Sequence, residues 1–256
     1  MVLCSPAHCD VTNLTPCSHE EADTRLLLHI SDAVQKGLKK VTIRTVDTDV
    51  VVLAVALFRR IKPEEMWIAF GGGTSFRHIS VHEIANKLDP STCAAFPLFH
   101  ALTGCDTVSA FAGRGKKTAW ETWKAFPEVT EAFNDILKME ADVNEARQQL
   151  FTHKSRTLEN MPPTKAGLVQ QIKRAAYQAN VWCKALEMDP QLPSPSDWGW
   201  VKDEVGWQPL WTTLPEASQS CYELIHCVCK KGCTTRCSCK KAALKCTALC
   251  LCSGDC

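Results

Sequence analysis

The sequence predicts an α/β domain with a partial, mostly parallel sheet, followed by a helical region and a small cysteine-rich module at the C-terminal end. Three observations lead to this fold class. Helical and strand patterns alternate in the first part of the chain, strand patterns stop at Phe96, and ten of the sixteen cysteines lie between Cys221 and Cys256. At 256 residues, the chain is long enough for one ordinary domain with one or two small additions.

The first predicted elements are a helix, a strand and a second helix. Apolar residues recur at helical spacing from His19 to Lys40, and β-branched residues alternate over Val41–Val46 as in a strand. Asp47 and Asp49 supply N-cap side chains for the next helix, which is expected over Val50–Ile61. The two carboxylates therefore lie at the junction between a strand and a helix.

A further strand is predicted over Met66–Phe70, and a short helix over Val81–Leu88. Strands that alternate with helices are typical of a mostly parallel sheet with helices on both faces. In such sheets, functional groups gather at the carboxyl ends of the strands. We therefore expect Asp47 and Asp49 to face a functional site.

The second half of the chain changes character twice. Phe99–Met188 has helical patterns broken by glycines and prolines, whereas Asp189–Ser220 alternates prolines with four tryptophans. We expect this last segment to be an extended strap whose tryptophans dock on the body of the protein, because a free linker would not expose so many indoles. The expected divisions are an N-terminal segment (1–18), an α/β domain (19–125), a helical region (126–188), the strap (189–220) and the cysteine-rich module (221–256).

Composition argues against a membrane protein and against a secreted one. The longest apolar run, Val50–Phe58, is far shorter than the roughly 20 residues that a helix needs to span a bilayer. Residues 1–10 have no basic segment followed by an apolar one, as a signal peptide would. The net charge of +1 favours no class of partner. We expect an intracellular, reducing location, in which clustered cysteines bind metal rather than form disulfides.

Nine of the C-terminal cysteines follow the spacing C-x-C-x3-C-x3-C-x-C-x6-C-x3-C-x-C-x3-C. A segment this short cannot bury enough apolar surface to fold alone, so metal binding has to supply folding free energy, on the order of 10 kcal/mol per structural zinc. Nine thiolates suffice for three zinc ions if three sulfurs are each shared by two ions. The predicted ligands are Cys227, Cys229, Cys233, Cys237, Cys239, Cys246, Cys250, Cys252 and Cys256.

This spacing resembles the CXC domain of the tesmin/TSO1 family and the related male-specific-lethal CXC domains. The resemblance implies a zinc cluster that binds DNA in the nucleus, and it places Arg236 where the male-specific-lethal type has an arginine. The implied DNA-contacting residues are Arg236, Lys230, Lys231, Lys240, Lys241 and Lys245. Residues 221–256 carry a formal charge of +4, and three zinc ions on nine thiolates contribute −3, so binding depends on where the basic side chains point. A zinc knot that only mediates protein contacts remains the alternative.

Acidic residues also precede the first helix and follow the first strand. Carboxylates from several elements are what two-metal phosphodiesterases use to hold two ions about 4 Å apart. The order of Glu21 and Asp23, then Asp47 and Asp49, then Leu102–Asp106 resembles the C-terminal half of a flap endonuclease, a PIN-like nuclease domain, over residues 20–123. The resemblance implies a PIN-like sheet and Mg²⁺ or Mn²⁺ ligands at Glu21, Asp23, Asp47, Asp49 and Asp106.

The same resemblance continues into a helix-hairpin-helix. Gly113 and Gly115 would offer backbone N–H groups to a DNA phosphate, and Lys116 and Lys117 would add positive charge. The family's opening strand, with a further catalytic aspartate, has no counterpart before Glu20, so the implied nuclease domain is incomplete. The pairing of this domain with a CXC module is also similar to transposon-derived proteins of animal genomes.

Simpler interpretations of the same residues stay open. The acidic residues can act as helix caps or favour a helix N-terminus, and Gly113 and Gly115 can form an ordinary turn between helices. His78 and His82 are expected to be surface or hydrogen-bonded histidines, and His100 a core residue rather than the partner of a Cys105 nucleophile.

Three functions follow from these patterns. The first is a metal-dependent, structure-specific nuclease joined to a zinc-cluster DNA-binding module. The second is a non-enzymatic DNA-binding or chromatin adaptor with the PIN-like part as scaffold. The third is a zinc-dependent protein-interaction module. DNA is the expected partner, a small-molecule substrate is not expected, and the sequence leaves the oligomeric state open.

Overall fold

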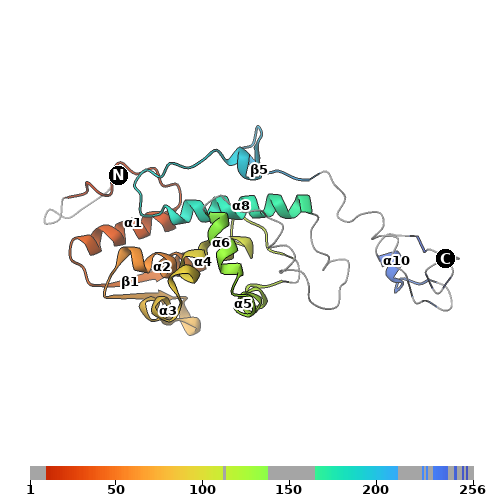
Figure 1. The fold of residues 1–256 in the computed structure, drawn as a ribbon, viewed down its shortest axis with the longest axis horizontal. Coiled ribbons are helices and arrows are strands. Elements are labelled where there is room, and N and C mark those ends of the chain that lie inside the picture. The colour runs from red at the N-terminus through yellow and green to blue at the C-terminus, as the bar shows by residue number, and fades with distance from the viewer. Residues whose placement is uncertain are drawn as a thin grey trace. The chain divides into compact units, whose positions relative to one another are not determined.

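The computed structural model describes residues 10–111, 114–137 and 165–212, and, near the C-terminus, residues 227, 229, 233–241, 245–246, 250 and 252. These residues belong to two compact units. The larger unit contains the described residues up to Leu137 together with Gln170–Leu210, and the smaller contains the other described residues, including the C-terminal cysteines. Figure 1 shows the elements of the chain, coloured from red at the N-terminus to blue at the C-terminus.

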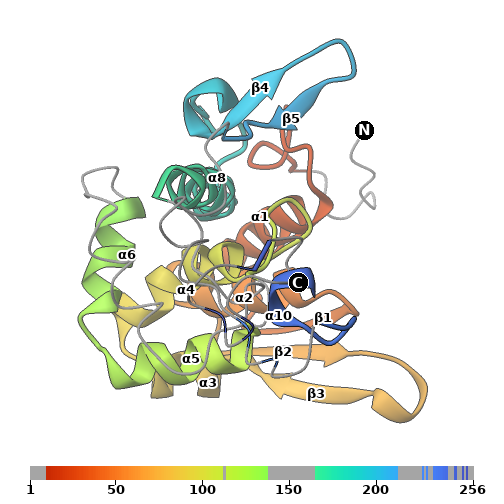
Figure 2. The same ribbon diagram turned by 90° about the vertical axis from the view of Figure 1, so that its right-hand side faces the viewer.

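A three-stranded sheet lies in the larger unit, in the order β1-β2-β3 (Figure 2). β1 (Lys40–Thr45) and β2 (Glu65–Phe70) are parallel, and β3 (Arg77–Ser80) pairs antiparallel with β2. The alternating burial along β1 is that of a strand with one face in the core. The expected parallel pairing is confirmed for β1 and β2, whereas β3 is an additional antiparallel edge strand.

Three helices accompany the sheet: one before β1, one between β1 and β2, and one after β3. These are α1 (Ala22–Gln35), α2 (Thr48–Ile61) and α3 (Val81–Lys87). α2 is the crossover helix and packs against α1 and α3. The buried side chains of α2 include Val50, Leu53 and Leu57, whose spacing places them on one helical face. The predicted first helix is confirmed as α1, which ends at Gln35, just before Gly37 with its φ of +99°.

Helices also form the other side of the core of this unit. α4 (Pro90–Leu102) packs against α2 and against α6 (Val129–Leu137), and α5 (Lys116–Ala125) joins them through aromatic contacts. The ring of Trp123 lies 5.0 Å from that of Phe99 and 5.2 Å from that of Phe133, centroid to centroid. The indole N–H of Trp123 donates to Thr130 Oγ1 at 2.8 Å, so this buried aromatic cluster leaves its one polar group satisfied.

The long helix α8 (Lys165–Cys183) is followed by a 3-10 turn, η3 (Pro195–Trp198), and a small hairpin of β4 (Trp200–Lys202) and β5 (Trp207–Pro209). The docking of the predicted strap is confirmed for Trp198, whose ring lies 6.3 Å from that of Tyr177 on α8. It is wrong for Trp207, which is 41% exposed. None of the helices in the described ranges is both long enough and apolar enough to cross a bilayer.

Candidate metal centre and carboxylate site

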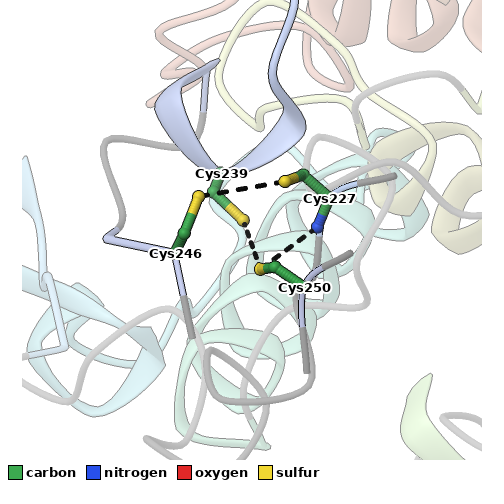
Figure 3. A group of neighbouring side chains, drawn as sticks. All are labelled: Cys227, Cys239, Cys246 and Cys250. Atoms are coloured by element: carbon green, nitrogen blue, oxygen red, sulfur yellow. Dashed lines mark hydrogen bonds between the residues drawn. The ribbon is translucent and has the colours of Figure 1, made fainter. Parts of the chain in front are cut away.

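The described cysteines of the smaller unit converge on one another. Cys227, Cys237, Cys239 and Cys250 are buried, and Cys229, Cys233, Cys246 and Cys252 pack against them. Figure 3 shows the sulfurs of Cys227, Cys239, Cys246 and Cys250 facing a common centre. The short helix α10 (Ser238–Lys241) carries Cys239 into this group. The buried group consists of cysteines alone, so contacts between their sulfurs hold it together.

The sulfur separations match those around a tetrahedral zinc ion. The Sγ–Sγ distances are 3.6 Å for Cys227–Cys233 and Cys227–Cys252, 3.8 Å for Cys227–Cys246, 3.5 Å for Cys233–Cys246 and 3.7 Å for Cys233–Cys252. A Zn–S distance of about 2.3 Å in a tetrahedron places sulfurs about 3.8 Å apart. The geometry and the thiolate chemistry therefore fit a metal that prefers sulfur, such as zinc.

The cysteines form three overlapping groups of four, in each of which the sulfurs all lie within 4.8 Å of one another. Cys227 belongs to all three groups, and Cys233 and Cys246 belong to two each. The groups are Cys227, Cys239, Cys246 and Cys250; Cys227, Cys233, Cys246 and Cys252; and Cys227, Cys229, Cys233 and Cys237. Such overlap is what a cluster with shared sulfurs requires. Cys256 lies outside the described residues.

The pKa values of two thiols in this cluster are shifted in opposite directions. The pKa of Cys237 is lowered to about 6, chiefly because the backbone N–H of Lys240 donates to its sulfur. Burial, together with the hydrogen bond to Cys250, raises the pKa of Cys239. Without a cation, packed thiols resist ionisation because neighbouring thiolates repel one another. The lowered pKa makes the Cys237 thiol easier to ionise near neutral pH than an ordinary cysteine.

Acid is expected to release the metal from this cluster. Zinc must displace a proton from each thiol that is not yet ionised, so affinity falls as pH falls. Above pH 6 Cys237 gives up no proton on binding, and below pH 6 it adds one more, which steepens the loss. Zinc release measured with a chromogenic chelator should be slight at pH 7.5 and rise most sharply between pH 6.5 and 5.5. An equal zinc content at all three pH values would contradict thiolate coordination.

The basic residues near the cluster differ in their surroundings. Arg236, Lys241 and Lys245 are exposed, and no hydrogen bond or ion pair of their side chains is seen within the described residues. The ammonium of Lys240 donates to the backbone carbonyl of Cys233 at 2.9 Å, which ties it to the cluster. Lys230 and Lys231 lie outside the described residues.

In the larger unit, the structure brings together the five carboxylates singled out from the sequence. Glu21 precedes α1, Asp47 and Asp49 begin α2 after β1, and Asp106 follows α4. Burial raises the pKa of Asp23, and the negative charges of Asp47, Asp49, Glu21 and Asp106 raise it further, in that order. The Asp23 carboxylate therefore lies close enough to the other four for their charges to repel its own. No three of these carboxylates place oxygens within 4.8 Å of one another in the described part of the chain.

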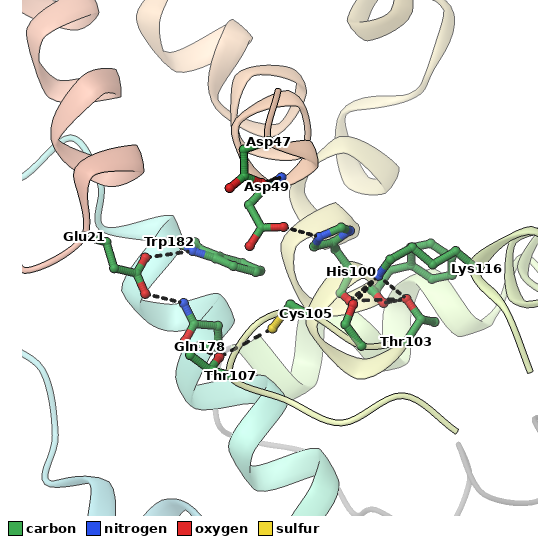
Figure 4. A network of polar contacts seen from close by, with 12 residues as sticks. Glu21, Asp47, Asp49, His100, Thr103, Cys105, Thr107, Lys116, Gln178 and Trp182 are labelled. Atoms are coloured by element: carbon green, nitrogen blue, oxygen red, sulfur yellow. Dashed lines mark hydrogen bonds and ion pairs between the residues drawn. The ribbon is translucent and has the colours of Figure 1, made fainter. Parts of the chain in front are cut away.

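Hydrogen bonds orient two of these carboxylates, one from a distant helix and one from the adjacent backbone (Figure 4). Glu21 accepts hydrogen bonds from Gln178 Nε2 at 2.9 Å and from Trp182 Nε1 at 3.1 Å, both on α8. Asp47 Oδ1 accepts from the backbone N–H of Asp49 at 2.8 Å, so the predicted N-cap is confirmed. The same residue that caps the helix also faces the carboxylate group, so capping and a functional role do not exclude each other.

His100 is the site residue whose role the sequence did not reveal. It is buried, as expected, and its Nε2 lies 2.7 Å from Asp49 Oδ1. The contact joins α4 to the start of α2 across 51 residues of sequence. In the sequence, the only sign of this role was that His100 is a titratable residue near the end of an otherwise apolar helix. His82 is hydrogen-bonded to the backbone of Met66, as expected of a satisfied histidine.

The two lysines at the start of α5 have different environments. The ammonium of Lys116 donates to the carbonyls of His100 and Gly104 and to Thr103 Oγ1, and burial lowers its pKa. The Lys116 ammonium therefore caps the C-terminal end of α4 and does not project toward a ligand. Lys117 is exposed. Gly115 is the N-cap of α5, and Gly113 lies outside the described residues.

An open cleft of about 460 Å³ lies beside these groups. Asp49, His100, Cys105, Asp106 and Lys116 line it. Arg114 lines it as well, so the described lining residues include two carboxylates, a histidine and two cationic side chains, of which Lys116 is bonded to backbone and hydroxyl oxygens.

No protein-family model, no curated protein and no solved structure matches this chain. What the site can do is therefore inferred from its own residues. A cysteine cluster that can hold zinc and a group of converging carboxylates are the two chemistries present in the described residues.

Proposed function

We propose that the chain is a DNA-associated protein whose C-terminal cysteines form a three-zinc cluster of the CXC type. The observation that carries this is the overlap of the three four-cysteine groups. Cys227, Cys233 and Cys246 are the sulfurs that recur, and three shared sulfurs are the number that nine thiolates need for three zinc ions. The cluster supplies folding free energy and a rigid base for the basic side chains around it.

The recurrence also assigns ligands to ions. Cys246 connects the first group to the second, Cys233 connects the second to the third, and Cys227 connects the first to the third. In this proposed assignment, Cys227 does not bind the second ion, and Cys256 is the fourth ligand of that ion. Each shared sulfur binds two ions, and each remaining cysteine binds one.

DNA contact by this module depends on exposed cations, of which Arg236 has the guanidinium that can pair with a phosphate or a base edge through two hydrogen bonds. Replacing Arg236 with alanine should weaken duplex DNA binding by about three- to tenfold. It should also lower the slope of log affinity against log salt by about 0.9, the value of one phosphate contact. The measurement is fluorescence anisotropy between about 50 and 200 mM salt. Lys124→Ala, which removes an exposed charge from α5, is the matched control.

Equal effects of the two substitutions, or binding that does not respond to salt, would instead favour the protein-interaction alternative. In that case the cluster would be structural, and its basic residues solvated. The zinc content would be unchanged in either variant, because neither residue is a ligand.

A second candidate function is divalent-metal-dependent phosphodiester cleavage at the carboxylate cleft. Its support is the convergence of four carboxylates around Asp23, whose pKa rises because the group is partly buried and because the other four charges repel its own. Carboxylate oxygens suit Mg²⁺ or Mn²⁺, which would relieve that repulsion. Such an ion, when bound, activates water and neutralises charge on the phosphate. Glu21 and Asp49 are held for this role by Trp182, Gln178 and His100.

In the non-enzymatic alternative, the larger unit is a scaffold and only the zinc module binds DNA. The same hydrogen bonds would then serve stability alone. The two functions differ in one measurable property, which is metal-dependent loss of a DNA substrate.

A further inference from the structure

A second open groove, of about 420 Å³, adjoins the carboxylate cleft. The two share Thr48, His100 and Lys116 as lining residues, so they meet at the start of α2 and the end of α4. The groove extends from there to the end of β2, where Phe70 lies, and to the start of β3. A ligand that enters one hollow therefore comes next to the other.

The groove is lined by aromatic rings that are only half covered. Phe70, Phe96 and Trp120 are all half-buried. Phe96 and Trp120 pack edge to face, with centroids 5.5 Å apart, and the wider aromatic cluster of α4 and α5 supports them from behind. Rings fixed in this way offer a rigid platform for another flat ring at little entropic cost.

Two cations border this platform. The Arg77 guanidinium lies 5.0 Å from the centroid of the Phe70 ring, its partner in the register of β2 and β3. Lys117 is exposed at the start of α5. The lining residues of this groove include no aspartate or glutamate, in contrast to the neighbouring cleft with Asp49 and Asp106. The described lining of the groove carries only positive charge, so the groove attracts anions.

We propose that this groove binds an unpaired nucleotide of a DNA strand. The base stacks on Trp120 and Phe96, and the adjacent phosphate lies between Arg77 and Lys117. An aromatic platform bordered by positive charge is the combination that single-stranded nucleic acid recognises. A nucleotide held there places the neighbouring phosphodiester at the carboxylate cleft. The inference deepens the second candidate function, but binding is measured without cleavage.

The first test uses the full, zinc-loaded chain and a fluorescein-labelled oligothymidine of about fifteen nucleotides, without added Mg²⁺ or Mn²⁺. Arg77→Gln/Lys117→Gln should weaken binding by about five- to twentyfold and lower the salt slope by about 1.4, which corresponds to two phosphate contacts on a single strand. Lys87→Gln/Lys124→Gln removes two exposed charges that do not line the groove, and it should leave both values nearly unchanged. All four positions are exposed, so folding is expected to be retained.

The second test maps the contact directly. An oligonucleotide carrying 5-iododeoxyuridine crosslinks to aromatic side chains on irradiation, and mass spectrometry then identifies the peptide. Crosslinks at Trp120, Phe96 or Phe70, together with the selective loss in the first test, support the groove. Equal losses in the two double variants, or crosslinks confined to the C-terminal module, overturn it and leave the zinc proposal standing. Absence of cleavage bears on neither measurement.

Discussion

Replacing Cys227 with serine is expected to reduce the zinc content from three ions per chain to one. Cys227 connects two of the proposed zinc sites, so its loss removes a ligand from both. Each structural zinc contributes on the order of 10 kcal/mol to folding, so the module should unfold as well. Native mass spectrometry of the purified chain counts the ions, and the thermal unfolding of the module reports its stability.

Cys229→Ser is the matched control, because Cys229 belongs to one group only and is half-buried, whereas Cys227 is buried. It should cost at most one zinc ion. Equal losses from the two variants would contradict the assignment of Cys227 as a shared sulfur. Two or fewer zinc ions in the unsubstituted chain would rule out the trinuclear cluster altogether.

Addition of Mn²⁺ is expected to produce cleavage of labelled flap or duplex DNA that Asp47→Asn/Asp49→Asn loses. The expected drop in rate is on the order of a hundredfold or more, since a metal ion contributes several kcal/mol of charge stabilisation in the transition state. Asparagine keeps the capping ability of Asp47, so α2 should stay intact. The measurement is a gel assay of cleavage with and without Mn²⁺.

Glu121→Gln/Glu131→Gln is the control for net charge, because both residues are exposed and neither lines the cleft. Cleavage that persists in the aspartate variant would point to a contaminating nuclease and contradict a site at this cleft. Retained DNA binding without any cleavage by the unsubstituted chain would favour the adaptor function instead.

The early part of the fold could be predicted because its signals are local. The alternation in β1, the helical spacing in α1 and α2, and the cap at Asp47 depend on residues within a few positions of one another. β3 escaped prediction because Arg77–Ser80 is short and polar and is a strand only through its pairing with β2. Trp207 shows that an apolar residue type does not fix burial.

The candidate sites also have parts that local sequence signals predict and parts that depend on long-range contacts. The cysteine spacing predicted a shared-sulfur cluster by arithmetic, and the overlapping groups are compatible with it. The contact of His100 with Asp49 and the bonds from α8 to Glu21 could not be predicted, because they join residues far apart in sequence. Lys116 was expected to contact DNA from its sequence neighbours alone. Its three internal acceptors become evident only when α4 and α5 are placed together.

The hydrogen bonds from α8 to Glu21 also determine when, during synthesis, this carboxylate can be oriented. Gln178 follows Glu21 by 157 residues, which a ribosome adds in about 8 to 30 s. Until then α1, α2 and the sheet can form by themselves, but the Glu21 carboxylate has neither of its side-chain donors. During synthesis, the last contact that orients this carboxylate group is therefore a slow, long-range one.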